Sequence, residues 1–220
     1  MLRILFVAVS ILHMVTFTAG YNAVMSIDLG SEFMKVAIVK PGIPMEIVLN
    51  EDSDRKTSTI VALRDGERYF GKAAENQAVK FPRKAFWYLT NLIGRKFDNA
   101  DVQLYKERFP YYDIVKDEER GTVLFKIDEE TTYSPEELLG MVLEKAKEYA
   151  EAFTDQTIKD CVITVPVYFT QSERKAVLHA AQLVDNDNLC ISALGGNDKR
   201  GRTYQASSVV KPQQPAIDCG

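Results

Sequence analysis

The sequence has few of the residues from which metal and disulfide sites are usually made. It contains three cysteines (Cys161, Cys190 and Cys219) and two histidines among 220 residues. Structural zinc sites need several closely spaced Cys and His ligands, and these cysteines lie far apart, so the sequence excludes a zinc finger. An odd number of cysteines also gives no complete disulfide framework. We expect His179, which falls in a helical pattern, to be a surface or packing residue.

The sequence also lacks a strong charge of either sign. Its formal net charge is −4, which gives no case for nucleic-acid binding. No Asn-x-Ser/Thr acceptor occurs, so glycosylation offers no check on topology. A hydrophobic content of 46% in 220 residues is typical of a soluble globular core of one or two domains.

The longest hydrophobic run lies in residues 1–20, where one arginine precedes apolar residues 4–17 and small residues follow. This layout predicts a cleaved signal peptide. A membrane anchor is the alternative, but the run is shorter than the roughly 20 residues that a spanning helix needs, and Ser10 and His13 interrupt it. We therefore expect entry into the secretory pathway, an oxidising compartment, and no membrane association after cleavage.

Residues 23–39, AVMSIDLGSEFMKVAIV, carry the clearest chemistry. Two apolar strand-type runs flank a tight turn with Asp28, Gly30 and Ser31. Glycine permits a turn that directs several N–H groups at one anion. A carboxylate at the end of a strand can orient a hydrated magnesium ion, and a serine hydroxyl can donate to a phosphate oxygen. An ordinary β-hairpin is the simpler alternative.

Further short strands are predicted at residues 45–49, 59–63 and 67–70, and their order suggests that they extend one twisted sheet. We expect a helix from about Lys72. A second helical stripe is predicted from Phe86, Leu89, Leu92 and Ile93, ending at Gly94. Residues 98–109 form the next predicted helix.

The second half of the chain alternates strands and helices. Residues 111–115 and 122–127 read as a hairpin. Ser134 and Glu137 form a capping box that opens a long helix, whose apolar face is expected to include Phe153. Residues 158–165 are a β-branched run typical of a buried strand, and a second capping box, Thr170 with Glu173, opens a helix to about Val184. Such a unit is α/β and needs a parallel sheet neighbour, for which we predict the first strand of the opening hairpin.

Beyond Asn186 the sequence loses its periodicity. Residues 186–220 are rich in Lys, Arg, Ser, Gln and Pro, so we expect an atypical, mostly disordered tail that does not continue the sheet.

Residues 66–72, GERYFGK, match most of a Walker A loop. Ala73 stands where the magnesium-binding Ser or Thr belongs, and the glycines flank a predicted strand rather than a strand-to-helix loop. A true P-loop is therefore not expected here.

Five segments occur in an order that resembles the nucleotide-binding domain of heat-shock protein 70 chaperones, members of the actin-like ATPase superfamily. They are SIDLGSE (26–32), GKAAENQA (71–78), LIGRKFDNADVQ (92–103), SPEELLGMVLEKAKEYAE (134–151) and VITVPVYFTQSERKAV (162–177). The resemblance implies an actin-like, ribonuclease H-like α/β fold, with residues 21–185 as the first, truncated part of a two-lobed ATP-binding domain.

Within that family, the chain resembles the large endoplasmic-reticulum branch, the hypoxia up-regulated proteins, through DLGSE and the phrase KVAIVKPGIPMEIVLN. The resemblance implies a chaperone of the endoplasmic-reticulum lumen that binds ATP and magnesium. Its implied partners are unfolded secretory proteins and co-chaperones, although this chain ends without a retention signal.

The resemblance also implies roles for individual residues. Asp28 is placed near magnesium, and Gly30, Ser31 and Glu32 are placed in the first phosphate loop. Pro166 and Arg174 match a proline and an arginine that transmit nucleotide state toward the substrate domain. Their simpler interpretation is a strand end and a surface helix residue. Asp187 is a tentative match to an acidic residue beside phosphate.

One departure from the family is chemical. The family's catalytic lysine lies in a G-D-A-A-K stretch, and Glu75 occupies its place, with Lys72 three residues earlier. The resemblance implies an ATPase, but a carboxylate beside a triphosphate adds repulsion where developing negative charge needs stabilisation, so hydrolysis at this site is doubtful and the enzymatic activity stays open. Nucleotide binding could persist without that lysine.

Two functions therefore remain open. The chain is either the ATP-binding N-terminal part of such a chaperone, or a lobe that does not bind ATP productively and acts as an interaction module. A half-cleft excludes water poorly, which favours weak binding in this chain by itself. A sugar or acetate kinase of the same superfamily shares the hairpin, but no substrate residue of such a kinase is found.

Overall fold

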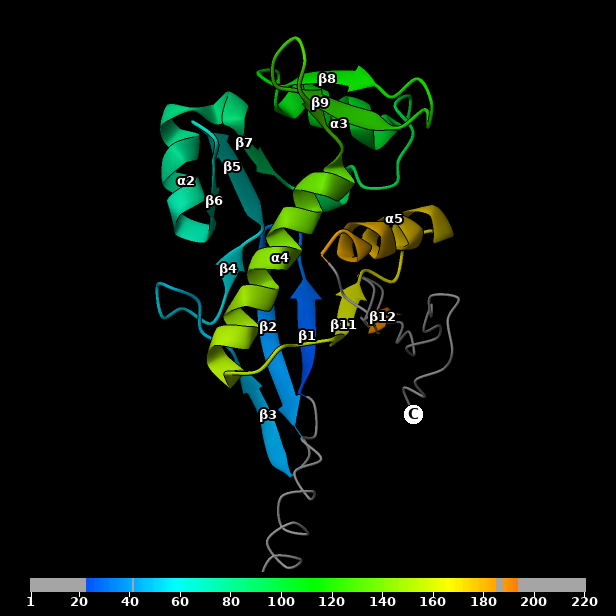
Figure 1. The fold of residues 1–220 in the computed structure, drawn as a ribbon. Coiled ribbons are helices and arrows are strands. Elements are labelled where there is room, and N and C mark those ends of the chain that lie inside the picture. The colour runs from blue at the N-terminus through cyan, green and yellow to red at the C-terminus, as the bar shows by residue number, and fades with distance from the viewer. Residues whose placement is uncertain (1–22, 41, 185–187, 194–220) are drawn as a thin grey trace, which may run out of the picture.

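The computed structural model describes residues 23–40, 42–184 and 188–193, which form a mixed six-stranded sheet, two smaller sheets and the helices around them (Figure 1). The large sheet has the order β12-β11-β1-β2-β3, and β4 also pairs with β2. Its strands are β1 (Val24–Leu29), β2 (Phe33–Lys40), β3 (Ile43–Ile47), β4 (Thr57–Ser58), β11 (Asp160–Val165) and β12 (Asn188–Ala193).

Strand β1 lies inside this sheet because both of its neighbours pair with it along its length. Met25, Ile27 and Leu29 alternate with more exposed residues and are buried. β1 runs antiparallel to β2, as the hairpin prediction requires, and parallel to β11 with Asp28 opposite Thr164. The predicted parallel partnership of these two strands, far apart in sequence, is confirmed.

The sheet continues beyond the point where we expected it to stop. β12 pairs with β11 in parallel over Asp160–Val165 and Asn188–Ala193. The prediction that nothing after Asn186 continues the sheet is therefore wrong for residues 188–193. A run of six residues is too short for its own periodicity to be read, but β11 offers it an open edge to pair with.

The strands that follow β4 do not extend the large sheet, and this prediction is also wrong. β5 (Ile60–Arg64) pairs with β6 (Glu67–Phe70) and β7 (Ala85–Trp87) in a separate sheet, covered by α2 (Gly71–Lys80). The boundary between β6 and α2 falls at Gly71, so the GERYFGK segment is strand followed by helix, and its context is not that of a P-loop.

The helical stripe predicted over residues 86–93 is wrong as well. Phe86 lies in β7 opposite Val61, and Tyr88 adopts a left-handed conformation with φ of 53° before the short 3₁₀-helix η2 (Leu89–Asn91). Another 3₁₀-helix, η1 (Pro82–Lys84), precedes β7. The same four apolar side chains are buried, but strand pairing with β5 overrides their helical spacing.

A third sheet and α3 (Ala100–Arg108) lie at the top of the molecule in Figure 1. The predicted hairpin is present as β8 (Asp113–Lys116) and β9 (Val123–Lys126), and β10 (Thr132–Tyr133) adds a third strand. Phe86 packs against Phe125 and Tyr112, with ring centroids 5.0 and 5.5 Å apart. Burial in this cluster raises the pKa of the Tyr105 and Tyr112 hydroxyls well above the usual range.

Both capping boxes form as predicted. Ser134 opens α4 (Pro135–Thr154), which crosses in front of β1 and β2 in Figure 1, and Thr170 opens α5 (Gln171–Gln182), which packs against α4. The predicted apolar face of α4 is buried except for Phe153, which is 46% exposed near the last turn. His179 of α5 is exposed, as one of its two interpretations predicted.

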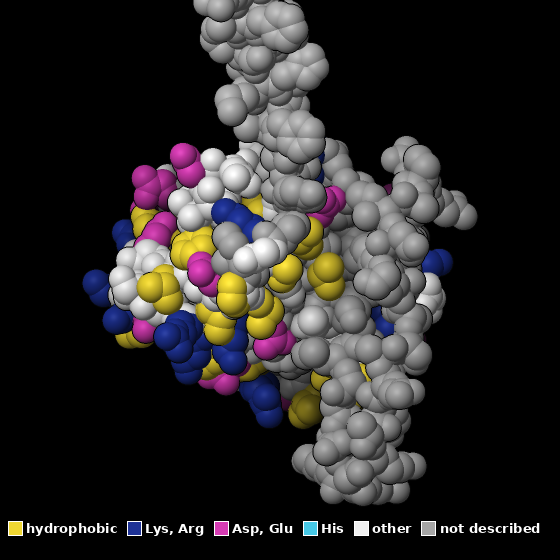
Figure 2. Space-filling model, turned by 90° about the horizontal axis from the view of Figure 1, so that it is seen from below, with side chains coloured by type: hydrophobic (Ala, Val, Ile, Leu, Met, Phe, Trp, Pro, Cys, Tyr) yellow, Lys and Arg dark blue, Asp and Glu magenta, His cyan; other side chains and the backbone are white. Residues whose placement is uncertain are grey.

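The lower end of the molecule exposes hydrophobic side chains around the edge strand β3, among them Met45, Ile47 and Phe153. Figure 2 shows this end with hydrophobic and charged side chains interspersed. Within the described residues, no helix has the length and apolar character needed to cross a bilayer.

Candidate functional site

The candidate site begins at Asp28, the next-to-last residue of β1. Its side chain is exposed, while both neighbours in β1 are buried, because the strand alternates. Thr164 of β11 lies beside it in the parallel register and donates a 3.2 Å hydrogen bond to Asp28 Oδ1. The rigid sheet therefore presents a carboxylate to solvent with one oxygen oriented by a threonine.

The turn after β1 is tight, but it does not depend on the backbone freedom that we expected glycine to supply. Gly30 has no positive φ. Instead, its N–H donates to Phe33 O at 3.1 Å, and a Cβ at position 30 would overlap that same oxygen. Thr59 braces the turn from β5's side, because its N–H donates to Glu32 O at 2.8 Å and its hydroxyl donates to Gly30 O at 3.2 Å. Glycine is needed here for close backbone approach.

Ser31 and Glu32 lie at the tip of this turn. Ser31 Oγ accepts a 3.0 Å hydrogen bond from Thr90 Oγ1, which comes from η2 and belongs to a side chain only 3% exposed. This bond holds Ser31 Oγ at the turn, and a serine hydroxyl can both donate and accept. Glu32 is exposed, and its backbone carbonyl is the group that holds the turn to Thr59.

Glu75 lies close to the turn, whereas Lys72 does not share its contact. Ser58 of β4 donates to Glu75 Oε1, and Ser58 pairs with Phe33 at the start of β2. The Glu75 carboxylate is therefore anchored beside the hairpin, where the resemblance places a lysine. Lys72, one turn earlier in α2, is exposed.

Pro166 and Arg174 lie at the two ends of one short loop. Pro166 follows β11, and its carbonyl accepts from Phe169 N at 3.0 Å. Arg174 reaches back from α5, and its Nε donates to Phe169 O at 3.0 Å. Only 9% of Arg174 is exposed, so its interpretation as a surface helix residue is wrong. The arginine instead holds the loop between β11 and α5 closed.

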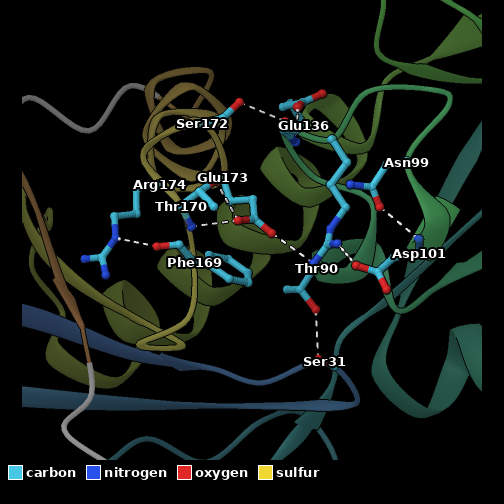
Figure 3. Close-up of polar contacts among 12 residues, drawn as sticks. Ser31, Thr90, Asn99, Asp101, Glu136, Phe169, Thr170, Ser172, Glu173 and Arg174 are labelled. Carbon is cyan, nitrogen blue, oxygen red and sulfur yellow. Dashed lines mark hydrogen bonds and ion pairs between the residues drawn. The ribbon is translucent and has the colours of Figure 1, made fainter. Parts of the chain in front are cut away.

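A neighbouring polar cluster was missed by sequence reasoning. Glu173 Oε2 accepts from Thr170 N at 2.7 Å, as the capping box predicts, but Glu173 Oε1 also forms a 2.9 Å ion pair with Arg95 Nη2. Arg95 further contacts Asp101 in the first turn of α3. Figure 3 shows Glu173 between Thr170 and the segment that carries Thr90.

The backbone before Arg95 also meets α5 directly. Gly94 has a φ of 66°, its carbonyl accepts from Ser172 Oγ at 2.8 Å, and its N–H donates to Glu136 Oε1 at 3.0 Å. Glu136, at the second position of α4, is 1% exposed. Gly94 was predicted only as the end of a helix, and no local pattern indicates that it joins the starts of two helices.

Metal binding at the turn would depend on Asp28 together with the oxygens of a bound phosphate. No group of three or more His, Cys, Asp and Glu side chains that could hold a metal is found in the described ranges. Asp28 does fit magnesium in its usual protein setting, since that ion keeps several waters and binds through one or two carboxylates plus phosphate oxygens. Neither of the larger hollows on the described surface, each of about 350 to 360 Å³, is lined by Asp28 or Ser31.

Sequence reasoning identified Asp28, Gly30 and Ser31 but missed Thr59, Thr90 and Thr164, which orient them. Thr164 could have been found once β11 was paired with β1, because the register puts it opposite Asp28. Thr90 is 59 positions from Ser31, and nothing in either segment points to the other. The tentative Asp187 lies outside the described residues.

Comparison with known proteins identifies the family of this chain. The family model described as "Hsp70 protein" matches residues 24–189. Hypoxia up-regulated protein 1 of Xenopus tropicalis is 55% identical over 177 residues, and the human protein of that name is 55% identical over 161 residues. These matches cover 77% and 73% of this chain, but 28% and 16% of the relatives.

The chain thus spans less than a third of the relatives that it matches. The matched span contains β1, the turn at Gly30, both capped helices and β11. The predicted fold class, an α/β first lobe of the actin-like ATPase type, is confirmed by this family match together with the mixed sheet and its covering helices. The chain therefore belongs to the Hsp70 protein family.

Proposed function

We propose that this chain supplies the phosphate- and magnesium-binding half of the ATP site in an Hsp70-type chaperone. The observation that carries the proposal is the turn at residues 30–32, where a braced backbone, the Ser31 hydroxyl and the exposed Asp28 carboxylate lie together at the end of β1. In the family fold a nucleotide lies between two lobes, and the described residues form one.

The residues have separate roles in this proposal. Asp28, held by Thr164, would orient a magnesium ion through its waters, and the Ser31 hydroxyl would donate to a phosphate oxygen. The Gly30 turn would bring backbone N–H groups close to that phosphate. Magnesium, when bound with ATP, neutralises charge on the phosphate oxygens. Pro166 and Arg174 would carry the nucleotide state toward the substrate domain.

The cellular role follows from family membership and the leader-like sequence. Residues 1–20, which lie outside the described residues, would direct the chain into the endoplasmic-reticulum lumen. There it would contribute to assisting unfolded secretory proteins under stress, together with co-chaperones. The relatives are named for hypoxia up-regulation, which agrees with a stress role for the full-length parent.

Titration with Mg-ATP, followed by NMR chemical shifts, tests the proposal. We expect shifts at the amides of Gly30, Ser31 and Glu32, with a dissociation constant on the order of 1 mM, which is about −4 kcal/mol. Asp28→Asn is expected to weaken the response to Mg-ATP more than the response to ATP with EDTA. Lys72→Gln, on the exposed side of α2, is the matched control and should change little.

Two results would count against this function. If the turn amides do not shift at 10 mM Mg-ATP, on the order of ten times the expected dissociation constant, the phosphate site is absent. A micromolar dissociation constant would instead refute the expectation that one lobe binds weakly.

Substitutions that change the charge at position 75 test whether Glu75 lies close enough to the phosphates to affect Mg-ATP binding. Glu75 is anchored by Ser58 beside the turn, so its negative charge opposes the phosphates. Glu75→Gln is expected to tighten Mg-ATP binding by about twofold, because it removes like-charge repulsion that water partly screens. Glu75→Lys is expected to tighten it by roughly threefold to tenfold, because it also adds attraction between the ammonium group and the phosphates. Equal affinities across the three proteins would place Glu75 outside the phosphate field.

A non-enzymatic interaction module is the second candidate. A hollow of about 360 Å³ lies beside α4, where apolar Met141, Leu183 and Val184 line it together with the charged side chains of Arg68, Glu137 and Glu144. Leu183, just after α5, is 53% exposed. Exposed apolar surface of this kind is typical of a contact site. The same titration separates the candidates, since a pure interaction module would leave the turn amides unshifted.

A further inference from the structure

The large sheet has two edge strands, and they differ in how well they are protected against pairing with another chain. Within the described ranges, β3 pairs only with β2 and β12 pairs only with β11, so these strands lie at opposite edges of the sheet (Figure 1). An edge strand presents a row of backbone N–H and C=O groups to which a further strand can bond. The residues at each edge therefore decide whether another strand can join the sheet.

β3 has three of the features by which proteins protect a sheet edge. Its second residue is Pro44, which has no N–H to donate, and Glu46 adds a charge two residues later. The pairing of β3 with β2 also shifts in register between Ile38 and Lys40, as at a β-bulge. A further strand would meet a missing donor, a charge and an irregular backbone, so this edge disfavours pairing.

β12 differs from β3 in each of these features. Its sequence, NLCISA, contains no proline, no glycine and no charged residue. All six residues pair with β11 in one continuous parallel register, from Asn188 opposite Asp160 to Ala193 opposite Val165. This edge of the sheet is therefore regular and uncharged.

A second copy of the same strand suits this edge. Two identical strands can pair antiparallel about a two-fold axis perpendicular to the sheet, so that outward N–H groups of each meet carbonyls of the other. In such a pair, a charged side chain comes close to its own counterpart and repels it. β12 carries no charge and meets this condition, whereas β3 with Glu46 does not.

The residues that follow β12 in the chain suit its edge less well. A hairpin back onto β12 would use residues 195–202, whose sequence is GGNDKRGR. Glycine, Asn, Asp and Lys are depleted in strands, and the segment offers no apolar side chain to pack. The composition therefore favours a second copy over the chain's own continuation as the partner of this edge.

We propose that two copies of this chain associate by antiparallel pairing of β12, which joins their large sheets into one continuous sheet. A two-fold axis perpendicular to the sheet keeps corresponding faces on the same side, so opposed residues share a face. In the two registers with the greatest overlap, Cys190 lies opposite its counterpart or diagonal to it, with Cβ atoms about 5 or 7–8 Å apart. This association does not depend on the proposed phosphate site.

The pairing is expected to be weak. One short strand forms few hydrogen bonds, each with a small net contribution, and association costs translational and rotational freedom. We therefore expect a dissociation constant between about 0.1 and 1 mM.

Sedimentation equilibrium of the full chain, with a reducing agent present so that no disulfide contributes, tests the pairing. Cys190→Lys is expected to weaken self-association by roughly tenfold, because two ammonium groups at that separation repel each other. Cys190→Ser, which is uncharged and of nearly the same size, is the matched control and should stay within about twofold of the wild type. Equal association of the lysine and serine variants would contradict the proposal.

A mixture of two charged variants separates repulsion from misfolding. Cys190→Lys and Cys190→Glu should each associate poorly alone, but an equal mixture of them should associate at least as tightly as the wild type, because opposite charges then meet across the axis. If the mixture stays as weak as its components, β12 does not lie at the contact and the inference is wrong.

Hydrogen exchange locates the contact. Between protein concentrations of about 10 µM and 1 mM, the outward-directed amides among residues 188–193 are expected to slow by roughly twofold to fivefold, in proportion to the paired fraction. The amides of residues 43–47, in the protected edge β3, should keep their rates. Slowing at β3 instead, or no dependence on concentration at either edge, would overturn the proposal. Protection of β12 that is equal at both concentrations would also overturn it, because the chain's own residues would then cover the edge.

Discussion

Gly94→Ala is expected to lower the free energy of unfolding by about 3 kcal/mol, the sum of a left-handed backbone cost and an overpacking cost. Gly94 has a φ of 66°, which L side chains rarely adopt, and the added Cβ would lie 2.8 Å from Ser172 O and 3.0 Å from Ala176 Cβ. Both neighbours belong to α5, which cannot move away without losing its packing in the core. Urea denaturation measures the change.

Gly66→Ala is the matched control for this substitution. Gly66 has a φ of 81°, but no atom lies within 4 Å of its hypothetical Cβ, so only the backbone cost of about 1 kcal/mol applies. The difference between the two variants therefore isolates the contact between the backbone at Gly94 and α5. Equal losses of stability would mean that α5 does not rest on Gly94.

Gly30→Ala is expected to remove the response of the turn amides to Mg-ATP, a loss of at least about tenfold in affinity, or 1.4 kcal/mol. The Cβ would overlap Phe33 O, the acceptor of the Gly30 N–H, so the turn must open. Since Gly30 has no positive φ, the effect comes from this contact and not from intrinsic backbone preference. NMR titration, run well below the unfolding temperature, measures it.

Gly42→Ala serves as the control for the turn, since Gly42 follows β2 and has nothing within 4 Å of its hypothetical Cβ. It should leave the Mg-ATP response intact. An unchanged response in Gly30→Ala would show that the close approach to Phe33 does not shape the phosphate site.

The parts of the fold that local patterns predicted are those whose reasons are local. The capping boxes at Ser134 and Thr170 satisfy backbone groups within four residues, and both form. The turn after Asp28 has a local part, the bond from Gly30 N to Phe33 O, although Thr59 braces it from a distant segment. The stripe of Phe86, Leu89, Leu92 and Ile93 failed because burial alone does not identify a helix, and pairing of Phe86 with Val61 was available.

The residues of the candidate site also divide into those that local patterns identified and those that distant contacts placed. Asp28, Gly30 and Ser31 were found because their chemistry lies in one turn, and Glu75 was found through resemblance to a family motif. Arg174 was partly misjudged, because its polarity suggests a surface and only the loop carbonyls of Val167 and Phe169 explain its burial. Charged groups are buried only where partners exist, and the partners come from folding.

By itself, then, the sequence determined the hairpin, the capped helices, the presence of strand β11 and the order of family motifs, since each depends on contacts or spacing within a short stretch. Burial of β11 on both faces was not correct, because its residues alternate between buried and partly buried. Tertiary structure alone decided that β5, β6 and β7 form a separate sheet, that β12 extends the large sheet, and that Thr90 meets Ser31 while Arg95 meets Glu173. These pairings join residues far apart in the chain, and their free energy depends on how whole elements pack, which no local pattern encodes.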